Sequence, residues 1–343
     1  MTATYDLPDA GTGGTAAGTG SVVLDVDGLS VDIRTPQGVV RAVDGVSFGA
    51  RRGETIALLG ESGCGKSMTA QAIVGLLAPV ADVSAGEVRL DGTDLVTASR
   101  KQRRALAGPE IAIVFQDALT ALNPVYTVGY QLAEPFRIHR GMSRKQARTE
   151  AIALMKRVGI PEPESRVDNY PHQFSGGMRQ RLLIAIAVAL SPTVLLADEP
   201  TTALDVTVQA QIMQLLTDLR SERDMAVVLI THDLALVSEQ ADRVVVMYAG
   251  TVVEQGPVGE VFGRPRHPYT KGLLDSVPAG ATRGSDLRSI GGSPPELQDI
   301  PAACVYQDRC PLVQDICRTE RPAPRHVGTD HASACHFSEE VSR

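Results

Sequence analysis

The chain has 343 residues, 43% of them hydrophobic and 21% charged, and its formal net charge is −7. This length fits one large domain with a smaller attachment, and the negative charge argues against a dedicated nucleic-acid binder. Its longest apolar run, 182–190, is far shorter than the roughly 18–20 residues that span a bilayer, so membrane association would require a partner. Residues 1–20 lack the basic and apolar segments of a secretory signal, and we expect them to be a disordered lead-in.

The first ordered segments are expected to be strands. Residues 22–26 alternate between apolar and polar types, 39–48 are strand-like, and 55–59 have the composition of a buried strand. Residues 66–77 then show the pattern of a helix. The first two strands predict a small β region that packs beside the loop between 59 and 66.

That loop, Gly60-Glu61-Ser62-Gly63-Cys64-Gly65-Lys66-Ser67, matches the phosphate-binding pattern Gly-x-x-x-x-Gly-Lys-Ser/Thr at every fixed position. Its glycines let successive backbone N–H groups point at phosphate oxygens, while Lys66 adds a positive charge and Ser67 a hydroxyl for Mg²⁺. An accidental match has a frequency on the order of one per cent in a chain of this length, so other motifs must support it. The residues expected to contact the nucleotide here are Gly60, Ser62, Gly63, Cys64, Gly65, Lys66, Ser67 and Met68.

The next part of the chain is predicted to change from strand to helix. Residues 88–90 and 111–115 have strand patterns, and Gln116 follows the second strand at its carboxyl end, where α/β sheets place chemistry. From 117 to about 171 the pattern is that of polar helices such as 143–158, separated by prolines. This change indicates an inserted helical subdomain.

Strand patterns return at 194–197 and 226–230, with helical spacing over 205–220 between them. His232 follows the second of these strands. Strand–helix alternation on both sides of the insert predicts a mostly parallel, helix-covered α/β sheet.

Two adjacent carboxylates, Asp198 and Glu199, follow the apolar run 194–197. In phosphoryl transfer, Asp198 would hold the Mg²⁺ shell, and Glu199 would orient and partly deprotonate the attacking water. An isolated Asp-Glu pair after a strand is usually a solvated turn. The phosphate loop upstream is what favours the catalytic interpretation.

A third motif, Phe174-Ser175-Gly176-Gly177-Met178, precedes a helix whose apolar run extends to residue 190. Ser175 is in an N-cap position and is followed by two glycines. On its own the motif would be a well-capped core helix. Here it lies between a phosphate loop and an Asp-Glu strand, in that order.

With these motifs in this order, the chain resembles the nucleotide-binding subunits of ATP-binding cassette (ABC) transporters over roughly 22–255. The resemblance implies a P-loop ABC ATPase fold of the α/β class, with an N-terminal antiparallel β region, an inserted helical subdomain and a small C-terminal extension that contains cysteines. It makes Gly60–Ser67 the Walker A loop, 174–178 the signature and 203–205 the D-loop.

The resemblance also assigns cofactors and roles. It implies ATP and Mg²⁺ as cofactors, and without it His232 would more often be a structural hydrogen-bonding residue. The implied catalytic residues are Glu199, His232 and Gln116. The implied Mg²⁺ site consists of Ser67, Gln116 and Asp198. Beyond the Walker A loop, the implied ATP contacts are Asp198, Ser175, Gly176, Gly177 and Asp205.

In this family two subunits enclose two ATP molecules, and each signature faces the phosphate loop of the other subunit. The resemblance therefore implies that Ser175 and Gly177 serve ATP bound to a partner and that the chain alone is a poor ATPase. An aromatic residue usually stacks on the adenine base, whereas the matching position here is Ile33. Apolar contact replaces ring stacking there.

Three further stretches, 122–129, 170–173 and 267–274, resemble the ATPase subunits of bacterial dipeptide and oligopeptide importers. Resemblance to this subgroup implies that the chain hydrolyses ATP to power peptide uptake through a membrane transporter. It also implies that the chain is a peripheral protein at the cytoplasmic face of the cell membrane. The implied partners are a second, non-identical ATPase subunit, two membrane permeases and a solute-binding protein, with no nucleic acid. The expected division of the chain is a lead-in, 1–20; an ABC nucleotide-binding domain, 21–260, with a helical subdomain at about 117–191; and an extension, 261–343.

Three alternatives stay open. Related importers carry nickel or other small solutes, so the same ATPase could serve another cargo. A soluble ABC ATPase acting on nucleic acid would carry coiled coils or two cassettes, whereas this chain has one cassette, no heptad array and no basic arm. A non-catalytic sensor built on the C-terminal cysteines is opposed by the intact Glu199 and His232.

Four of the five cysteines lie in the C-terminal tail: Cys304, Cys310, Cys317 and Cys335. Their uneven spacing does not fit a secreted disulfide framework. Close Cys-x₂₋₄-Cys pairs, typical of structural zinc sites, are absent, whereas all-cysteine iron–sulfur clusters tolerate wider spacing. The resemblance to peptide-importer ATPases implies a [4Fe–4S] cluster. Zn²⁺ with mixed ligands and a chance grouping of buried thiols are the alternatives.

Overall fold

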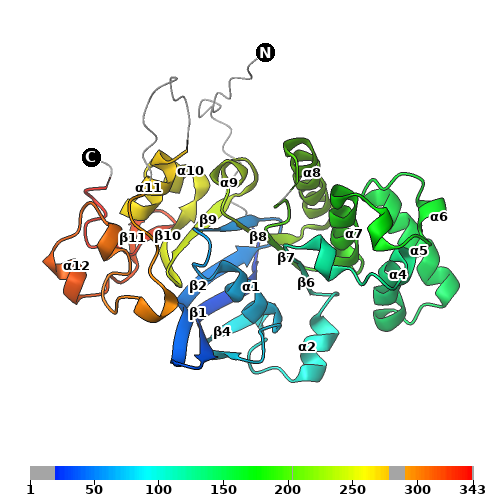
Figure 1. The fold of residues 1–343 in the computed structure, drawn as a ribbon, viewed down its shortest axis with the longest axis horizontal. Helices are drawn as coiled ribbons and strands as arrows, with labels where there is room; N and C mark the ends of the chain where they lie inside the picture. Colours follow the sequence, from blue (N-terminus) through cyan, green and yellow to red (C-terminus); the bar gives the residue numbers. More distant parts are fainter. Residues whose placement is uncertain (1–19, 203, 278–289, 342–343) are drawn as a thin grey trace, which may run out of the picture.

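The computed structural model of the chain describes residues 20–202, 204–277 and 290–341. The predicted lead-in, 1–20, lies outside the described residues except for its last residue. The described residues form two sheets, with helices packed around the larger one and a helical lobe at the opposite end of the molecule from the C-terminal extension (Figure 1). In this part of the chain no helix is both long and apolar enough to cross a membrane.

The smaller sheet is antiparallel, which confirms the predicted N-terminal β region. Its order is β2-β1-β4-β5. Strand β1 is longer than the alternating stretch 22–26, because register shifts beyond Val26 interrupt the alternation without ending the strand. The strands are β1 (Val22–Thr35), β2 (Gly38–Arg51), β4 (Ala81–Leu90) and β5 (Thr93–Asp94).

The larger sheet has the order β11-β12-β10-β9-β3-β8-β7-β6. From β9 to β6 every neighbouring pair is parallel, as predicted, and β3, β7 and β8 are buried along their whole length. The other pairings, from β11 to β9, are antiparallel. The strands are β3 (Thr55–Leu59), β6 (Ile111–Val114), β7 (Val194–Asp198), β8 (Ala226–Thr231), β9 (Arg243–Tyr248), β10 (Thr251–Pro257), β11 (Arg325–Gly328) and β12 (His331–Ser333).

Helices around the parallel strands begin and end at recognisable caps. Helix α1 (Lys66–Val74) ends at Gly75, whose φ of 71° breaks the helix before the predicted end at 77. Helix α8 (Val206–Arg223) begins after Asp205, whose carboxylate accepts a hydrogen bond from the backbone N–H of Val208 at 2.9 Å. Two shorter helices are α2 (Arg100–Leu106) and α9 (Leu234–Gln240).

The segment between β6 and β7 forms the helical lobe at the right of Figure 1. It has a hydrophobic core of its own, in which Leu132, Phe136 and Met155 from the first two long helices pack with Leu182. A capping box between Ser143 and Gln146 starts the helix predicted over 143–158. The elements are α3 (Ala118–Ala121), α4 (Val128–His139), α5 (Arg144–Arg157), α6 (Pro163–Arg166), the 3₁₀ turn η1 (Pro171–Gln173) and α7 (Gly176–Val188).

The C-terminal extension is continuous with the nucleotide-binding fold rather than separate from it. Strand β12 pairs with β10, and buried Tyr306 packs against Tyr248 of β9 and Tyr269. The carboxylate of Glu254 lies 2.8 Å from the His331 ring in the buried seam. The elements are α10 (Val258–Gly263), α11 (Pro268–Asp275), the 3₁₀ turns η2 (Leu297–Asp299) and η3 (Gln307–Arg309), and α12 (Asp315–Thr319).

Candidate nucleotide site

A cavity of about 660 Å³ lies where the carboxyl ends of β3, β7 and β8 meet. Its volume is within the range of about 300–1,000 Å³ that holds small ligands. Sequence-predicted residues from three separate motifs meet in it. It is lined by Ala42, Leu59, Gly60, Glu61, Ser62, Gly63, Gly65, Lys66, Ser67, Met68, Gln116, Glu199, His232, Leu273 and Leu297.

The loop before α1 needs its glycines for packing and for backbone shape. A Cβ at Gly60 would lie 2.3 Å from the Met247 carbonyl oxygen, and Gly65 has a φ of 102° that L side chains rarely adopt. The buried Lys66 ammonium donates to the carbonyl oxygens of Gly60 at 2.7 Å and Glu61 at 2.9 Å. The loop therefore curves around its own lysine and holds this positive charge at the cavity.

Ser67 and Asp198 lie together although 131 positions separate them. The Ser67 hydroxyl donates to Oδ1 of Asp198 at 3.0 Å. Burial raises the pKa of Asp198, and the adjacent Glu199 carboxylate adds to this effect, while the hydrogen bond from Ser67 opposes it. A hydroxyl and a carboxylate in this position fit the oxygen ligands that Mg²⁺ prefers.

Glu199 lies just beyond β7 with a left-handed backbone, φ 44°. Its Oε2 accepts hydrogen bonds from Gln116 Nε2 at 2.7 Å and from the Thr202 hydroxyl at 2.8 Å. Its Oε1 lies 3.0 Å from Nδ1 of His232. Burial alone would raise the pKa of Glu199, but the hydrogen bonds from Thr202 and His232 outweigh it and lower the pKa. The carboxylate is thus held charged and oriented by three neighbours.

The signature residues lie on a different part of the surface. Ser175 caps α7, since its hydroxyl accepts a hydrogen bond from the N–H of Met178, and a Cβ at Gly177 would lie 2.6 Å from a Val208 methyl. Gly177 therefore permits the close approach of α7 to α8. In the described part of the chain the cavity is not lined by the predicted ATP contacts Ser175, Gly176, Gly177 and Asp205.

Sequence reasoning missed several residues at the site, among them Thr202, Leu273 and Leu297. Thr202 holds Glu199, and Leu273 and Leu297 reach the cavity from the C-terminal extension. A signal existed for Leu273, because the stretch 267–274 resembles peptide-importer ATPases. Nothing local marks Leu297, which lies in a proline-flanked turn far along the chain from the loop.

The C-terminal cysteines do not form a recognisable metal site. Burial raises the pKa of Cys310 to about 12 and of Cys335 to about 11, and neighbouring thiols contribute. Cys304 and Cys317 are buried, and the backbone N–H of Cys304 donates to the carbonyl of Cys317 at 3.1 Å. Yet within the described residues no group of three or more His, Cys, Asp or Glu side chains could hold a metal ion. The described residues thus show neither the predicted cluster nor a zinc site.

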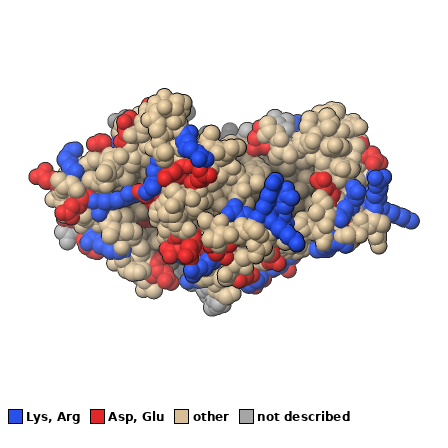
Figure 2. Space-filling model, turned by 90° about the horizontal axis from the view of Figure 1, so that it is seen from below, with Lys and Arg blue, Asp and Glu red and all other residues tan. Residues whose placement is uncertain are grey.

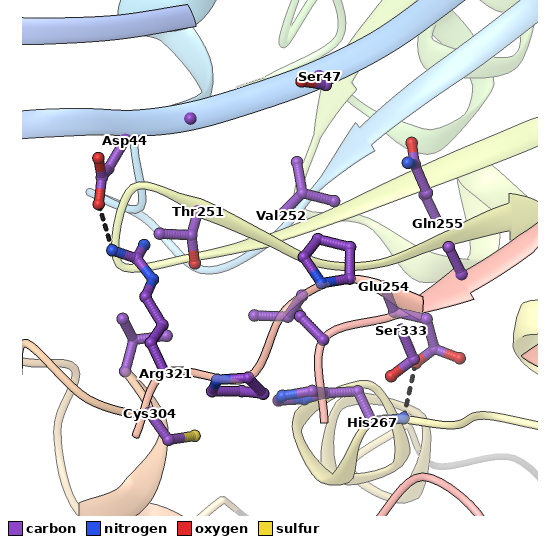
Figure 3. Close-up of a pocket in the computed structure, with 17 residues that line it drawn as sticks. Asp44, Ser47, Thr251, Val252, Glu254, Gln255, His267, Cys304, Arg321 and Ser333 are labelled. Atoms are coloured by element: carbon purple, nitrogen blue, oxygen red, sulfur yellow. Dashed lines mark hydrogen bonds and ion pairs between the residues drawn. The ribbon is translucent and has the colours of Figure 1, made fainter. Parts of the chain in front are cut away.

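Cys304 instead lines a separate cavity of about 340 Å³ between β2, β10 and the extension (Figure 3). Figure 3 shows the ion pair of Arg321 with Asp44 and the hydrogen bond from the backbone N–H of His267 to Glu254 at its walls. These contacts join the extension to the rest of the protein. No residue of the predicted nucleotide site is among those lining this cavity in the described part of the chain.

Comparisons with known proteins identify the family. A family model described as ABC transporter matches residues 43–202, and one described as oligopeptide/dipeptide transporter, C-terminal region, matches 253–317. The dipeptide transport ATP-binding protein DppD of Escherichia coli (strain K12) is 48% identical over 315 residues, which cover 92% of this chain and 96% of the relative. The chain belongs to the ATP-binding proteins of ABC transporters. It is accordingly an ATPase of the ABC type.

Other relatives and solved structures agree with this family. DppD of Bacillus subtilis (strain 168) is 48% identical and covers 91% of this chain and 94% of its own length. The dimeric, post-hydrolysis structure of the ATP-binding cassette MJ0796 with ADP and Pi is 28% identical, with a TM-score of 0.62 over 68% of this chain and 98% of that chain. The structure of cbiO1 from Clostridium perfringens is 31% identical, with a TM-score of 0.59 over 71% and 91%. The predicted fold class is confirmed.

Proposed function

We propose that this ABC protein hydrolyses ATP to power the uptake of dipeptides or oligopeptides through a membrane transporter. The observation that carries the proposal is the meeting of Lys66, Ser67 and Glu199 at one cavity, where Ser67 is hydrogen-bonded to Asp198. The chain is also similar over nine-tenths of its length to dipeptide transport ATP-binding proteins. The match of the extension to the oligopeptide/dipeptide transporter C-terminal region supports the peptide cargo.

In the proposed reaction the Walker A loop binds the phosphates. Its backbone N–H groups and the start of α1 face the anion, and Lys66 exchanges its bonds to loop carbonyls for bonds to phosphate oxygens. Ser67 and Asp198 would hold Mg²⁺, which neutralises charge on the phosphates when bound. Removing either oxygen ligand would weaken that binding.

Glu199 is the proposed general base. Its carboxylate is ionised at neutral pH because hydrogen bonds lower its pKa, so it can orient a water molecule and accept a proton from it. Gln116 and His232, which contact opposite oxygens of this carboxylate, fix its direction. We infer that Gln116 also links the site to the transporter, since it begins the connection from β6 to the helical lobe.

We infer that the chain works at the cytoplasmic face of a membrane with two permeases, a solute-binding protein and a second, non-identical ATPase subunit. The position of Ser175 and Gly177 away from the cavity supports a role for them at the ATP of a partner. The domain division proposed is an ABC domain, 21–260, with the helical subdomain at about 117–191, and an extension, 261–343.

For the extension we propose a [4Fe–4S] cluster held by Cys304, Cys310, Cys317 and Cys335. What speaks for it is the proximity of the thiols, since burial first and then Cys335, Cys304 and Cys317 raise the pKa of Cys310, although the described arrangement does not form a metal site. Iron and acid-labile sulfide in anaerobically purified protein would support it. Zinc at one per chain without iron would favour the alternative ion, and neither metal would leave a group of buried thiols.

The cargo is tested by transport. The chain, its companion ATPase and both permeases are reconstituted in proteoliposomes with the solute-binding protein, and ATP-dependent uptake of a labelled dipeptide is compared with uptake of Ni²⁺. We expect dipeptide uptake that stops without ATP. Nickel uptake in place of peptide uptake would refute the peptide cargo while leaving the ATPase assignment intact.

The nucleic-acid alternative has no observation in its favour. On the face seen in Figure 2, basic side chains are interspersed with acidic ones over the surface. The net charge of −7 would also oppose approach to a phosphate backbone.

A further inference from the structure

The nucleotide cavity continues into a second cavity of about 440 Å³. The two share Glu61, Ser62 and Gly63 of the Walker A loop and Leu297 of the extension as lining residues. The second cavity is also lined by Ile33 and by Thr35 and Val40, which flank the turn between β1 and β2, and by the segment 294–298. A ligand held by its phosphates in the loop would therefore extend toward this space.

The segment 294–298 is held in place from two sides. Its 3₁₀ turn η2 packs against β2, and Figure 1 shows this part of the extension beside β1 and β2. Arg309 forms the second anchor: its guanidinium donates to both carboxylate oxygens of Glu61, at 2.7 and 3.1 Å, and to the Gly291 carbonyl at 2.9 Å. One arginine thus ties the Walker A loop to the chain that leads into the segment.

The chemistry of this space suits a flat, weakly polar ring. Ile33, Val40 and Pro295 offer partly buried apolar surface. The ring of Tyr248 also lines the cavity, but only 1% of this residue is exposed. Leu297 leaves 37% of its surface exposed at the junction of the two cavities, so a ring entering there would cover it.

We propose that Leu297 of the C-terminal extension contacts the base of bound ATP, so that the extension completes the nucleotide site at the end where Ile33 provides no ring for stacking. This inference rests on the proposed function, because it assumes that the Walker A loop holds the phosphates of ATP. Arg309 is then a positioning residue that keeps the segment 294–298 at the loop.

The test separates base contact from phosphate contact. The full chain is titrated, with Mg²⁺ present, with ATP and with inorganic tripolyphosphate, which has the phosphates but no base. For Leu297→Ala we expect ATP to bind about three- to sixfold more weakly, because the shorter side chain covers less of the base, with tripolyphosphate affinity unchanged. Ile316→Ala is the matched control, since Ile316 is 38% exposed in the same extension and lines neither cavity.

The converse variant, Leu297→Phe, supplies a ring that can stack on the base and should tighten ATP binding without changing tripolyphosphate binding. This variant keeps the test valid if Leu297→Ala folds poorly. The inference is overturned if Leu297→Ala binds ATP like Ile316→Ala, or if ATP and tripolyphosphate weaken by the same factor, or if Leu297→Phe leaves ATP affinity unchanged. Wild-type protein that binds neither ligand would instead refute the proposed function itself.

Discussion

Replacing Arg309 by alanine should release the extension from the Walker A loop. Only 5% of the Arg309 side chain is exposed, and it donates to both oxygens of Glu61, to the Tyr248 hydroxyl at 3.3 Å and to the Gly291 carbonyl. Breaking a fully buried ion pair costs about 3–5 kcal/mol. Because the Glu61 side chain is 28% exposed, water can solvate its freed carboxylate. We therefore expect Arg309→Ala to destabilise this region by about 2–3 kcal/mol.

Amide hydrogen exchange, measured segment by segment, reports this destabilisation locally. In Arg309→Ala, a cost of about 2–3 kcal/mol corresponds to roughly 30- to 150-fold faster exchange of the amides in 290–310. Arg41→Ala is the control, because its ion pair with Asp32 is on the surface, with 51% of the arginine side chain exposed, and should contribute at most about 1 kcal/mol. Equal exchange of 290–310 in both variants would refute the anchoring role of Arg309.

Three further predictions concern the nucleotide site. Lys66→Ala should weaken ATP binding roughly 10- to 150-fold, because the variant cannot form charged hydrogen bonds to phosphate, and an unchanged binding isotherm would contradict the phosphate-loop assignment. Ser175→Arg should impair ATP hydrolysis at the partner's site in the assembled transporter while leaving ATP binding by this chain intact; the reverse pattern would exclude action in trans. Burial raises the pKa of Asp198 above the ordinary 3.8. As the pH falls, its carboxylate should therefore gain a proton at a pH higher than 3.8, and the Mg²⁺-dependent part of ATP affinity should be lost with that protonation. This pH dependence should be absent in Asp198→Asn, and a pH dependence unchanged by that substitution would be evidence against Asp198 as a ligand.

Local patterns were sufficient for the parallel core. The strand–loop–helix around 55–74, the capped helix after Ser143 and the start of α8 at Asp205 follow from short-range sequence signals. The meeting of Ser67 with Asp198 also follows. Asp198 ends β7, and Ser67 lies in the first turn of α1, after the loop at the carboxyl end of β3, and both strands belong to one parallel sheet.

Other features depend on contacts between distant residues. Strands β11 and β12 have four and three residues. Strand β12 pairs with β10 on one side and β11 on the other, and this pairing buries polar residues such as His331 that no alternation marks. The ion pair of Arg309 with Glu61 joins positions 248 residues apart. The left-handed backbone of Glu199, which directs its side chain toward His232, is set by the turn after β7 and has no sequence signal. The sequence therefore predicts the extension only as an attachment. In the structure the extension lines the nucleotide site through Leu273 and Leu297.

In the proposed mechanism Glu199 activates water for ATP hydrolysis in a transporter ATPase. The most direct measurement compares wild type with Glu199→Gln, which keeps the shape of the side chain, in the reconstituted transporter; Glu239→Gln, on the exposed face of α9, is the control. We predict that Glu199→Gln binds ATP as wild type does but hydrolyses it at least about 100-fold more slowly, since a general base contributes about 10²–10⁴ in rate. Hydrolysis at the wild-type rate in Glu199→Gln would show that Glu199 is not the general base.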